Sequence, residues 1–127
     1  IAPSLVGSEM CIRDSNYAQQ SMKAENTFGE GRSATENRLW NVFGALDDSG
    51  QSAGNVAYVF NPYSSSSYTF CIWQSSSQPG GNYRMYKGSG VLKQLDTITG
   101  FQAELNESAG EFASGGKIKV YGLRVDS

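Results

Sequence analysis

The stretch YTFCIWQ, Tyr68–Gln74, decides the fold of this chain. Its side chains alternate between two faces with the period of a β-strand: Phe70 and Ile72 share one face, and Cys71 and Trp73 share the other. A strand that is apolar on both faces is usually central and covered twice, or it meets a partner subunit. We therefore expect a β-sheet with this strand in its interior.

Similar short strand patterns lie on both sides of this stretch, separated by turn-forming Gly, Ser, Asn and Pro residues. The expected strands are Leu39–Leu46, Val56–Asn61, Tyr68–Gln74, Tyr83–Gln94, Thr97–Asn106 and Lys117–Val125. In the last of them, Ile118 and Val120 are expected to point inward. Gly88 and Gly90 lie inside a strand, which indicates a bulge or the close approach of a neighbour. The pattern predicts an all-β, antiparallel β-sandwich that is jelly-roll-like.

The composition agrees with an all-β domain and excludes several classes of function. The chain has 127 residues, about one domain, with 15 Gly, 7 Tyr, 6 Phe and 2 Trp. A net charge of −2 provides no basic field for nucleic acid, and no apolar run is long enough to span a bilayer, so we expect neither partner. The absence of histidine removes Ser-His-Asp and Cys-His nucleophiles and the commonest zinc ligand sets. Carboxylate-based glycoside hydrolysis is not removed.

The first residues differ in character from the rest. LVGSEMCIRDS, Leu5–Ser15, has neither the order of a secretory signal nor an apolar helix face, and it resembles a translated sequencing adapter. We therefore expect residues 1–15 to be non-native and the domain to lack its N-terminal strands. Cys11 then carries no weight, and Cys71 is expected to be a lone buried thiol rather than half of a disulfide.

A polar lead-in, residues 16–38, follows and is expected to be weakly structured. Within it, GEGRSA (Gly29–Ala34) fits a short dinucleotide-binding pattern. No apolar strand precedes this motif and no amphipathic helix follows it, so a flexible Gly-rich loop is the preferred interpretation. The β-sandwich domain is expected to span residues 39–127.

Aromatic residues are the candidate ligand-binding groups, because a flat ring with a polar tip can stack on a sugar. Six positions qualify: Trp40, Tyr63, Tyr68, Trp73, Tyr83 and Tyr86. Tyr83 and Tyr86 are the best candidates for a glycan contact, since they adjoin the SSSQPGGN loop and loops often carry binding residues. Packing in the core or at an interface is the competing interpretation for all six.

Two groups of carboxylates raise the question of a metal site or a catalytic pair. DDSGQ, Asp47–Gln51, lacks the alternating spacing and distal Glu of a calcium loop, and a solvated turn is the preferred interpretation. Nothing in the sequence sets two of Glu104, Glu107 and Glu111 across a cleft, as glycoside hydrolysis requires, so solvated surface carboxylates are expected. We predict no catalytic residue, no metal and no cofactor.

Four motifs mark the last third of the chain: Gly90–Lys93, Ile98–Phe101, Ala109–Gly115 and Lys117–Leu123. In this order they resemble the C-terminal part of jelly-roll domains in bacteriophage tail-fibre and other virion structural proteins, especially those of uncultured marine phages. The connection Asn61–Phe70 also resembles the middle of such domains. The resemblance covers about Val56–Ser127.

The resemblance implies a function of shape. A non-enzymatic structural or receptor-binding module of a virion would contact other virion proteins and host surface glycan. Such proteins are commonly homo-oligomers, often trimers, which would suit the apolar face carrying Trp73. The alternative is a carbohydrate-binding module of a secreted bacterial protein, and a weaker third hypothesis is a fragment of a polysaccharide depolymerase. Fold alone does not separate these functions.

Overall fold

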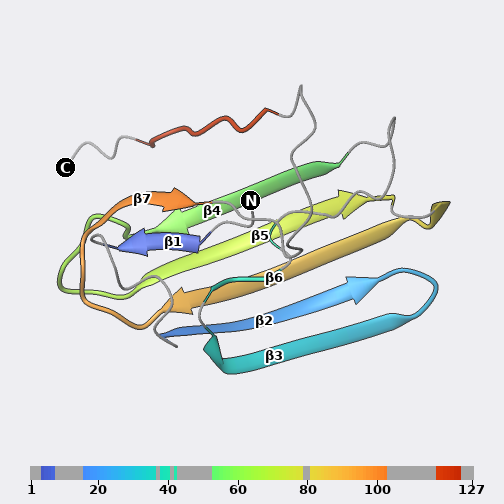
Figure 1. The fold of residues 1–127 in the computed structure, drawn as a ribbon, viewed down its shortest axis with the longest axis horizontal. Helices are drawn as coiled ribbons and strands as arrows, with labels where there is room; N and C mark the ends of the chain where they lie inside the picture. Colours follow the sequence, from blue (N-terminus) through green and yellow to red (C-terminus); the bar gives the residue numbers. More distant parts are fainter. Residues whose placement is uncertain are drawn as a thin grey trace.

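The computed structural model describes residues 4–7, 16–36, 38–40, 42, 53–78, 81–102 and 117–123. These residues form two antiparallel sheets, so the predicted all-β class is confirmed (Figure 1). The small sheet pairs β1 (Ser4–Gly7) with β7 (Ile98–Gln102). The large sheet has the order β3-β2-β6-β5-β4, and its strands are β2 (Tyr17–Ala24), β3 (Phe28–Glu36), β4 (Gly54–Phe60), β5 (Thr69–Ser77) and β6 (Arg84–Leu92).

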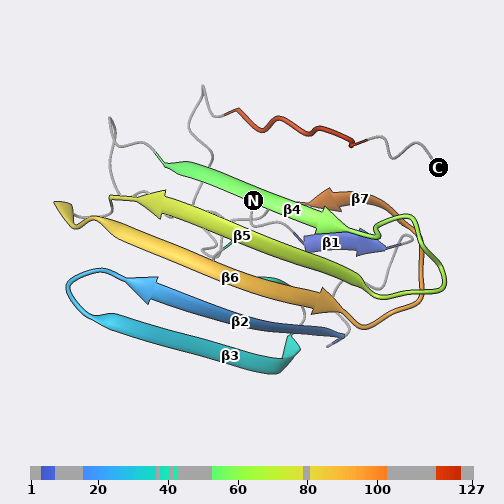
Figure 2. The ribbon, with the colours of Figure 1, turned by 180° about the vertical axis from the view of Figure 1, so that it is seen from behind.

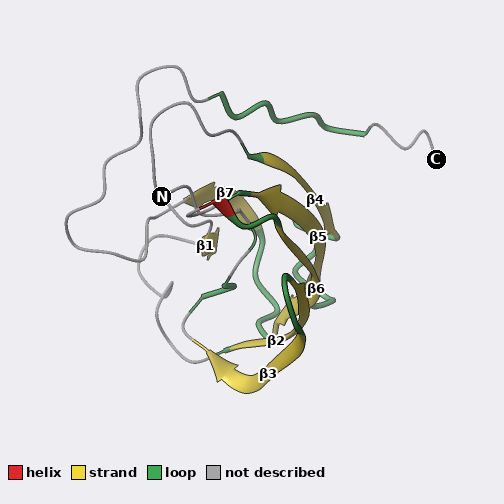
Figure 3. Cartoon of the chain, turned by 90° about the vertical axis from the view of Figure 1, so that its right-hand side faces the viewer, coloured by secondary structure: helices red, strands yellow, loops and turns green. Residues whose placement is uncertain are grey.

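The large sheet is curved, and the β1–β7 pair lies on its concave side (Figure 3). Figure 2 shows the large sheet from behind, with the same five strands side by side. This arrangement of two sheets is consistent with a sandwich. Each strand of the large sheet therefore presents one face toward the small sheet and one face away from it.

The core lies on the concave face, which we call the inner face. Its buried apolar residues are Tyr17, Leu39, Val42, Cys71, Trp73, Leu92 and Ile98. Cross-strand register explains the grouping, because Cys71 and Trp73 of β5 pair with Gly90 and Gly88 of β6. A residue in β7, Ile98, joins this cluster from the small sheet, and its amide donates to the Pro62 carbonyl at 2.6 Å.

Two glycines of β6 allow this core to close. A Cβ atom at Gly88 would lie 2.3 Å from Trp73 Cζ2, and one at Gly90 would lie 2.4 Å from Leu39 Cδ2. The pairings of β6 with its two neighbours show no register shift. The predicted close approach is confirmed, and the alternative of a bulge is not.

The expected weak structure of residues 16–38 is wrong. β2 and β3 form a hairpin, and β2 lies inside the sheet between β3 and β6. Gly29–Ala34 is part of β3, so the flexible-loop interpretation is also wrong. The sequence signal is weak because β2 is held by backbone pairing on both sides, and its one fully buried apolar side chain is Tyr17, 1 % exposed. The described large sheet begins at that residue, so a boundary at 39 divides it.

Two expected strands are absent at their described positions. Leu39 and Val42 are buried but lie outside strands, and they cover the inner face from a loop. Lys117–Leu123 has no strand partner among the described residues, and Ile118 and Val120 are 54 % and 67 % exposed instead of inward. Apolar alternation marks a segment able to form a strand, but it does not supply a neighbouring strand.

The expectation of double coverage for β5 is also wrong. Trp73 is only 3 % exposed, so its face belongs to the core and not to an oligomer interface. The opposite face of β5, with Phe70 and Ile72, is the uncovered one. The strand is nevertheless interior to the sheet, as predicted, because β4 and β6 flank it.

Strands are confirmed at four other predicted places, where β4, β5, β6 and β7 form. Cys71 is free and buried, and burial raises the pKa of its thiol to about 11. Cys11, Asp47–Gln51 and the three carboxylates at 104, 107 and 111 lie outside the described residues.

β1 lies within the segment that resembles an adapter. Its backbone pairs with β7, with Ser4 opposite Gln102 and Leu5 opposite Phe101. This four-residue strand shows that Ser4–Gly7 can pair with a neighbouring strand. It does not show whether the segment is native to the protein. The non-native origin of residues 1–15 therefore stays a prediction.

Candidate functional site

The face of the large sheet opposite the core is the candidate site, and we call it the open face. Two adjacent cross-strand rows form its centre. The first row is Arg32, Gln20, Ser89, Ile72 and Tyr58, and the second is Glu30, Met22, Lys87, Gln74 and Val56. Both rows cross all five strands, so strand pairing alone fixes the spacing of these side chains.

Large apolar side chains are exposed on this face. Tyr58 is 53 % exposed, Phe70 47 % and Ile72 44 %. Soluble proteins seldom leave a contiguous apolar patch uncovered unless it meets a ligand or a partner. The exposure therefore makes the open face the candidate binding surface of the described part of the chain.

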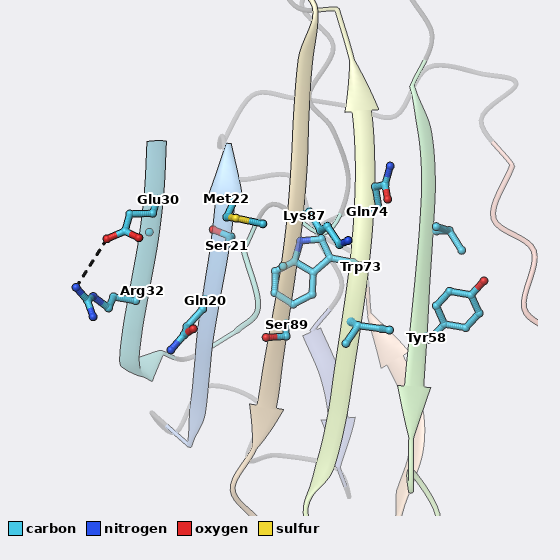
Figure 4. A pocket seen from close by; sticks show the side chains of 14 residues that line it. Gln20, Ser21, Met22, Glu30, Arg32, Tyr58, Trp73, Gln74, Lys87 and Ser89 are labelled. Atoms are coloured by element: carbon cyan, nitrogen blue, oxygen red, sulfur yellow. Dashed lines mark ion pairs between the residues drawn. The ribbon is translucent and has the colours of Figure 1, made fainter. Parts of the chain in front are cut away.

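A groove of about 510 Å³ runs over the two rows (Figure 4). Its polar side chains come from β2, β3, β5 and β6, and Tyr58 borders it on β4. Trp73 and Gly88 also line it, but they belong to the inner row by register, so we assign their main chain to its floor. The groove thus has an open rim of mixed polar and apolar side chains above a backbone floor.

A second groove of about 550 Å³ continues the first along the strands. The two grooves share four lining residues: Gln20, Arg32, Ile72 and Ser89. Because they share these walls, the grooves form one continuous surface. Such a surface suits an elongated ligand better than a compact one.

The chemistry of the groove is that of hydrogen bonding beside an aromatic ring. Gln20 and Gln74 each carry an amide donor and acceptor, and Lys87 adds a donor. Glu30 and Arg32 form an ion pair at 3.8 Å with both side chains more than 70 % exposed, so it contributes little stability. Planar amides and a tyrosine ring along one groove match the hydroxyl groups and apolar ring faces of an extended sugar chain.

The described part of the chain contains carboxylates that form ion pairs and hydrogen bonds within the fold. No group of three or more Cys, Asp or Glu side chains able to hold a metal occurs there. Glu25 forms a close cluster with two cations: its carboxylate accepts a hydrogen bond from Arg84 at 2.8 Å and pairs with Lys23 at 2.6 Å. These partners hold the pKa of Glu25 below its ordinary 4.5, and the cluster joins the end of β2 to β6. Its place and its contacts indicate a structural role.

The two tyrosines singled out from the sequence do not meet on the open face. Tyr86 pairs across the sheet with Ser75 and Lys23, which places it in an inner row. Tyr83 precedes β6 and is 67 % exposed. Sugar binding by either residue stays a prediction, but the structure does not bring them together as a platform.

The other four aromatic candidates occupy different environments. Trp73 is in the core, and Tyr63 and Tyr68 are exposed in the β4–β5 connection, 81 % and 43 %. Trp40 is half-buried: its backbone amide donates to Gln19 Oε1 at 2.7 Å, and its indole donates to Glu36 Oε2 at 2.8 Å. The indole N–H of Trp40 is therefore already used within the fold.

The sequence analysis missed Tyr58, Gln20 and Gln74. The alternation in VAYVFN did place Tyr58 on one face of a strand, but it did not show that this face is uncovered. The two glutamines gave no signal, because they come to line the same groove as the tyrosine only through the order of the strands.

Comparison with known proteins adds no relative: no family model, curated protein or solved structure matches the chain. Among the described residues, no helix is long and apolar enough to cross a membrane. The geometry of the open face and the sequence motifs are therefore the observations that bear on function.

Proposed function

We propose that this chain is a non-enzymatic receptor-binding module of a phage virion, of the tail-fibre kind, and that its open face contacts host surface glycan. The observation that carries the proposal is the continuous groove that extends from Gln20 on β2 to exposed Tyr58 on β4, with Gln74 on β5, the strand next to Tyr58. The resemblance of Val56–Ser127 to virion jelly-roll domains supports the virion setting. Other virion proteins would hold the module in the particle.

The groove supports an extended saccharide because of its shape and its charge. It crosses the sheet without a deep cavity, and its ionic groups are balanced apart from one cation, with Glu30 beside Arg32 and Lys87 unpaired within the rows. A neutral or weakly anionic polysaccharide fits these features. Its ring faces would stack on Tyr58, and its hydroxyls would bond to the glutamine amides.

The test is a binding screen of the full chain on bacterial capsules, O-antigens and intact cells. We expect specific binding that Tyr58→Ala weakens at least about tenfold, which equals about 1.4 kcal/mol. Gln74→Ala should also weaken it, and Tyr63→Ala, an exposed tyrosine outside both grooves, is the matched control. No binding to any bacterial surface, or binding that Tyr58→Ala leaves unchanged, contradicts the proposal.

A second candidate function is a carbohydrate-binding module of a secreted bacterial protein, favoured by the same groove. The two proposals differ in the source of the glycan. Binding confined to plant or algal polysaccharides, without attachment to bacterial cells, would favour the second. Release of reducing sugar from a bound capsule would contradict both, because it would show a hydrolase.

A further inference from the structure

The edge of the large sheet at β4 is chemically unprotected. All seven residues of β4, Gly54–Phe60, are exposed, and β5 is its one neighbour among the described strands. Its sequence GNVAYVF contains no charge and no proline. Lysine, proline and bulges are the usual means of preventing an edge strand from pairing with another chain, and β4 pairs with β5 without a register shift. As far as the described strands go, the edge of β4 is therefore suited to strand addition.

A second segment of the same chain has the complementary property. Lys117–Leu123, KIKVYGL, lies outside any described strand, and all seven residues are exposed. Val120 is 67 % exposed, Tyr121 79 % and Leu123 87 %. β-branched and aromatic residues of this kind favour strands. Among the described strands, β4 thus has no neighbour on its outer side, and Lys117–Leu123 is a segment able to form a strand that pairs with none of them.

Direction decides which copy of the segment fits the edge. In Figures 1 and 2, Lys117–Leu123 runs in the same direction as β4, and Figure 3 shows it leaving the sheet. Pairing within one chain would therefore be parallel, although every pair among the described strands is antiparallel. Parallel pairing is slightly less stable per residue. A second copy is free to turn over and offer the segment in the antiparallel direction.

We propose that β4 is an interface between copies of this chain, and that it binds Lys117–Leu123 of a second copy as an added antiparallel strand. The main-chain groups of the edge would supply affinity in the manner of strand addition. Both partner surfaces belong to one sequence, so the contact can be reciprocal and close a dimer, or pass around a ring. This proposal does not depend on glycan binding.

The experiment is sedimentation velocity of the full chain from about 1 μM to about 1 mM, where association must depend on concentration. Val120→Pro removes an amide donor from the donated segment, and Val56→Lys places a charge on the edge opposite a lysine-bearing strand. Each variant should raise the dissociation constant at least about tenfold. An equimolar mixture of the two should associate, because one keeps an intact edge and the other keeps an intact donor.

Three results overturn the proposal: a monomeric wild type over the whole range, association that Val120→Pro leaves unchanged, or variants that fail to complement each other. A monomer whose melting temperature falls with Val120→Pro would show pairing within one chain instead. Fluorescence of buried Trp73 checks that both variants keep the fold. Tyr63→Lys, in the exposed connection after β4, is the charge control.

Discussion

The two faces of β5 carry side chains of similar hydrophobicity, but one face is buried and the other is exposed. Cys71 and Trp73 are each 3 % exposed, whereas Phe70 and Ile72 are 47 % and 44 % exposed. The difference lies in the neighbouring strand. The inner residues pair with glycines of β6, which leave room for an indole, and the outer ones pair with Val91 and Ser89.

Alternation along β5 therefore assigns its residues to two faces, and the glycines of the neighbouring strand β6 identify the face that is buried. On the face without such glycines, the side chains remain exposed to solvent. The inner face of this protein therefore sets stability, and the open face is free to bind. The changes below test that division in order of decreasing expected effect.

Truncation of neighbouring residues on β5 should separate the two faces most strongly. Trp73→Ala is expected to cost about 3–5 kcal/mol of unfolding free energy, since it empties a buried site. Ile72→Ala, on the exposed side, should cost less than about 1.5 kcal/mol because close to half of its surface, 44 %, is already exposed to solvent. Urea denaturation measures both, and equal losses would contradict the assignment of faces.

Alkaline pH should act on the inner face through Cys71. Its pKa is raised from 9.0 to about 11, so the neutral thiol stabilises the fold below pH 9, and this contribution is lost as pH rises through 11. The loss would be about 2–3 kcal/mol when complete. The difference in stability between wild type and Cys71→Val, measured from pH 8 to about 11, isolates this group from other titrations. A difference that does not vary with pH would show that the thiol is solvated.

Adding one methyl group should test the close approach at β6. Gly88→Ala is expected to cost about 1–3 kcal/mol, because the new Cβ would meet the Trp73 ring and the Gln20 carbonyl oxygen, 2.9 Å away. Gly31→Ala is the matched control in β3, where the nearest atom, Ser21 Oγ, is 3.6 Å away. Thermal melts of the pair would contradict the packing account if both variants lost the same amount.

Acid should have the smallest effect, through Glu25. Its pKa is lowered first by the bond from Arg84 and then by that from Lys23. The ionised carboxylate therefore stabilises the fold above pH 4.5, and this contribution is lost as pH falls through the lowered value. Wild type and Glu25→Gln should differ at pH 7 and converge in acid, as judged by urea midpoints. Parallel curves at all pH values would show that the cluster does not stabilise the hairpin.

The strands with apolar alternation were predictable from the sequence, and the polar ones were not. The pattern around Trp73 and the glycines at 88 and 90 indicated a close-packed strand pair, which the structure confirms. β2 and β3 escaped prediction because backbone pairing, rather than apolar side chains, holds them. Leu39 and Val42 led to the opposite error, a strand that the described residues do not form. A buried loop and a strand can have the same apolar composition.

The candidate site was beyond the reach of sequence reasoning for a geometric reason. Gln20 and Tyr58 are 38 positions apart, and they share a row only because β6 and β5 lie between their strands. Tyr83 and Tyr86 are close in sequence and adjoin a turn, but an odd separation along a strand tends to place residues on opposite faces. Proximity along the chain was therefore a poor guide to a surface built from five strands.

The central claim, that the open face binds glycan while the inner face only supports it, is tested most directly by one nitrogen-resolved NMR titration. The isotopically labelled full chain is titrated with the polysaccharide that binds best in the screen. We expect the side-chain amide signals of Gln20 and Gln74 to shift with saturation while the indole signal of buried Trp73 stays in place. Shifts at the indole with unchanged glutamine amides would contradict the account.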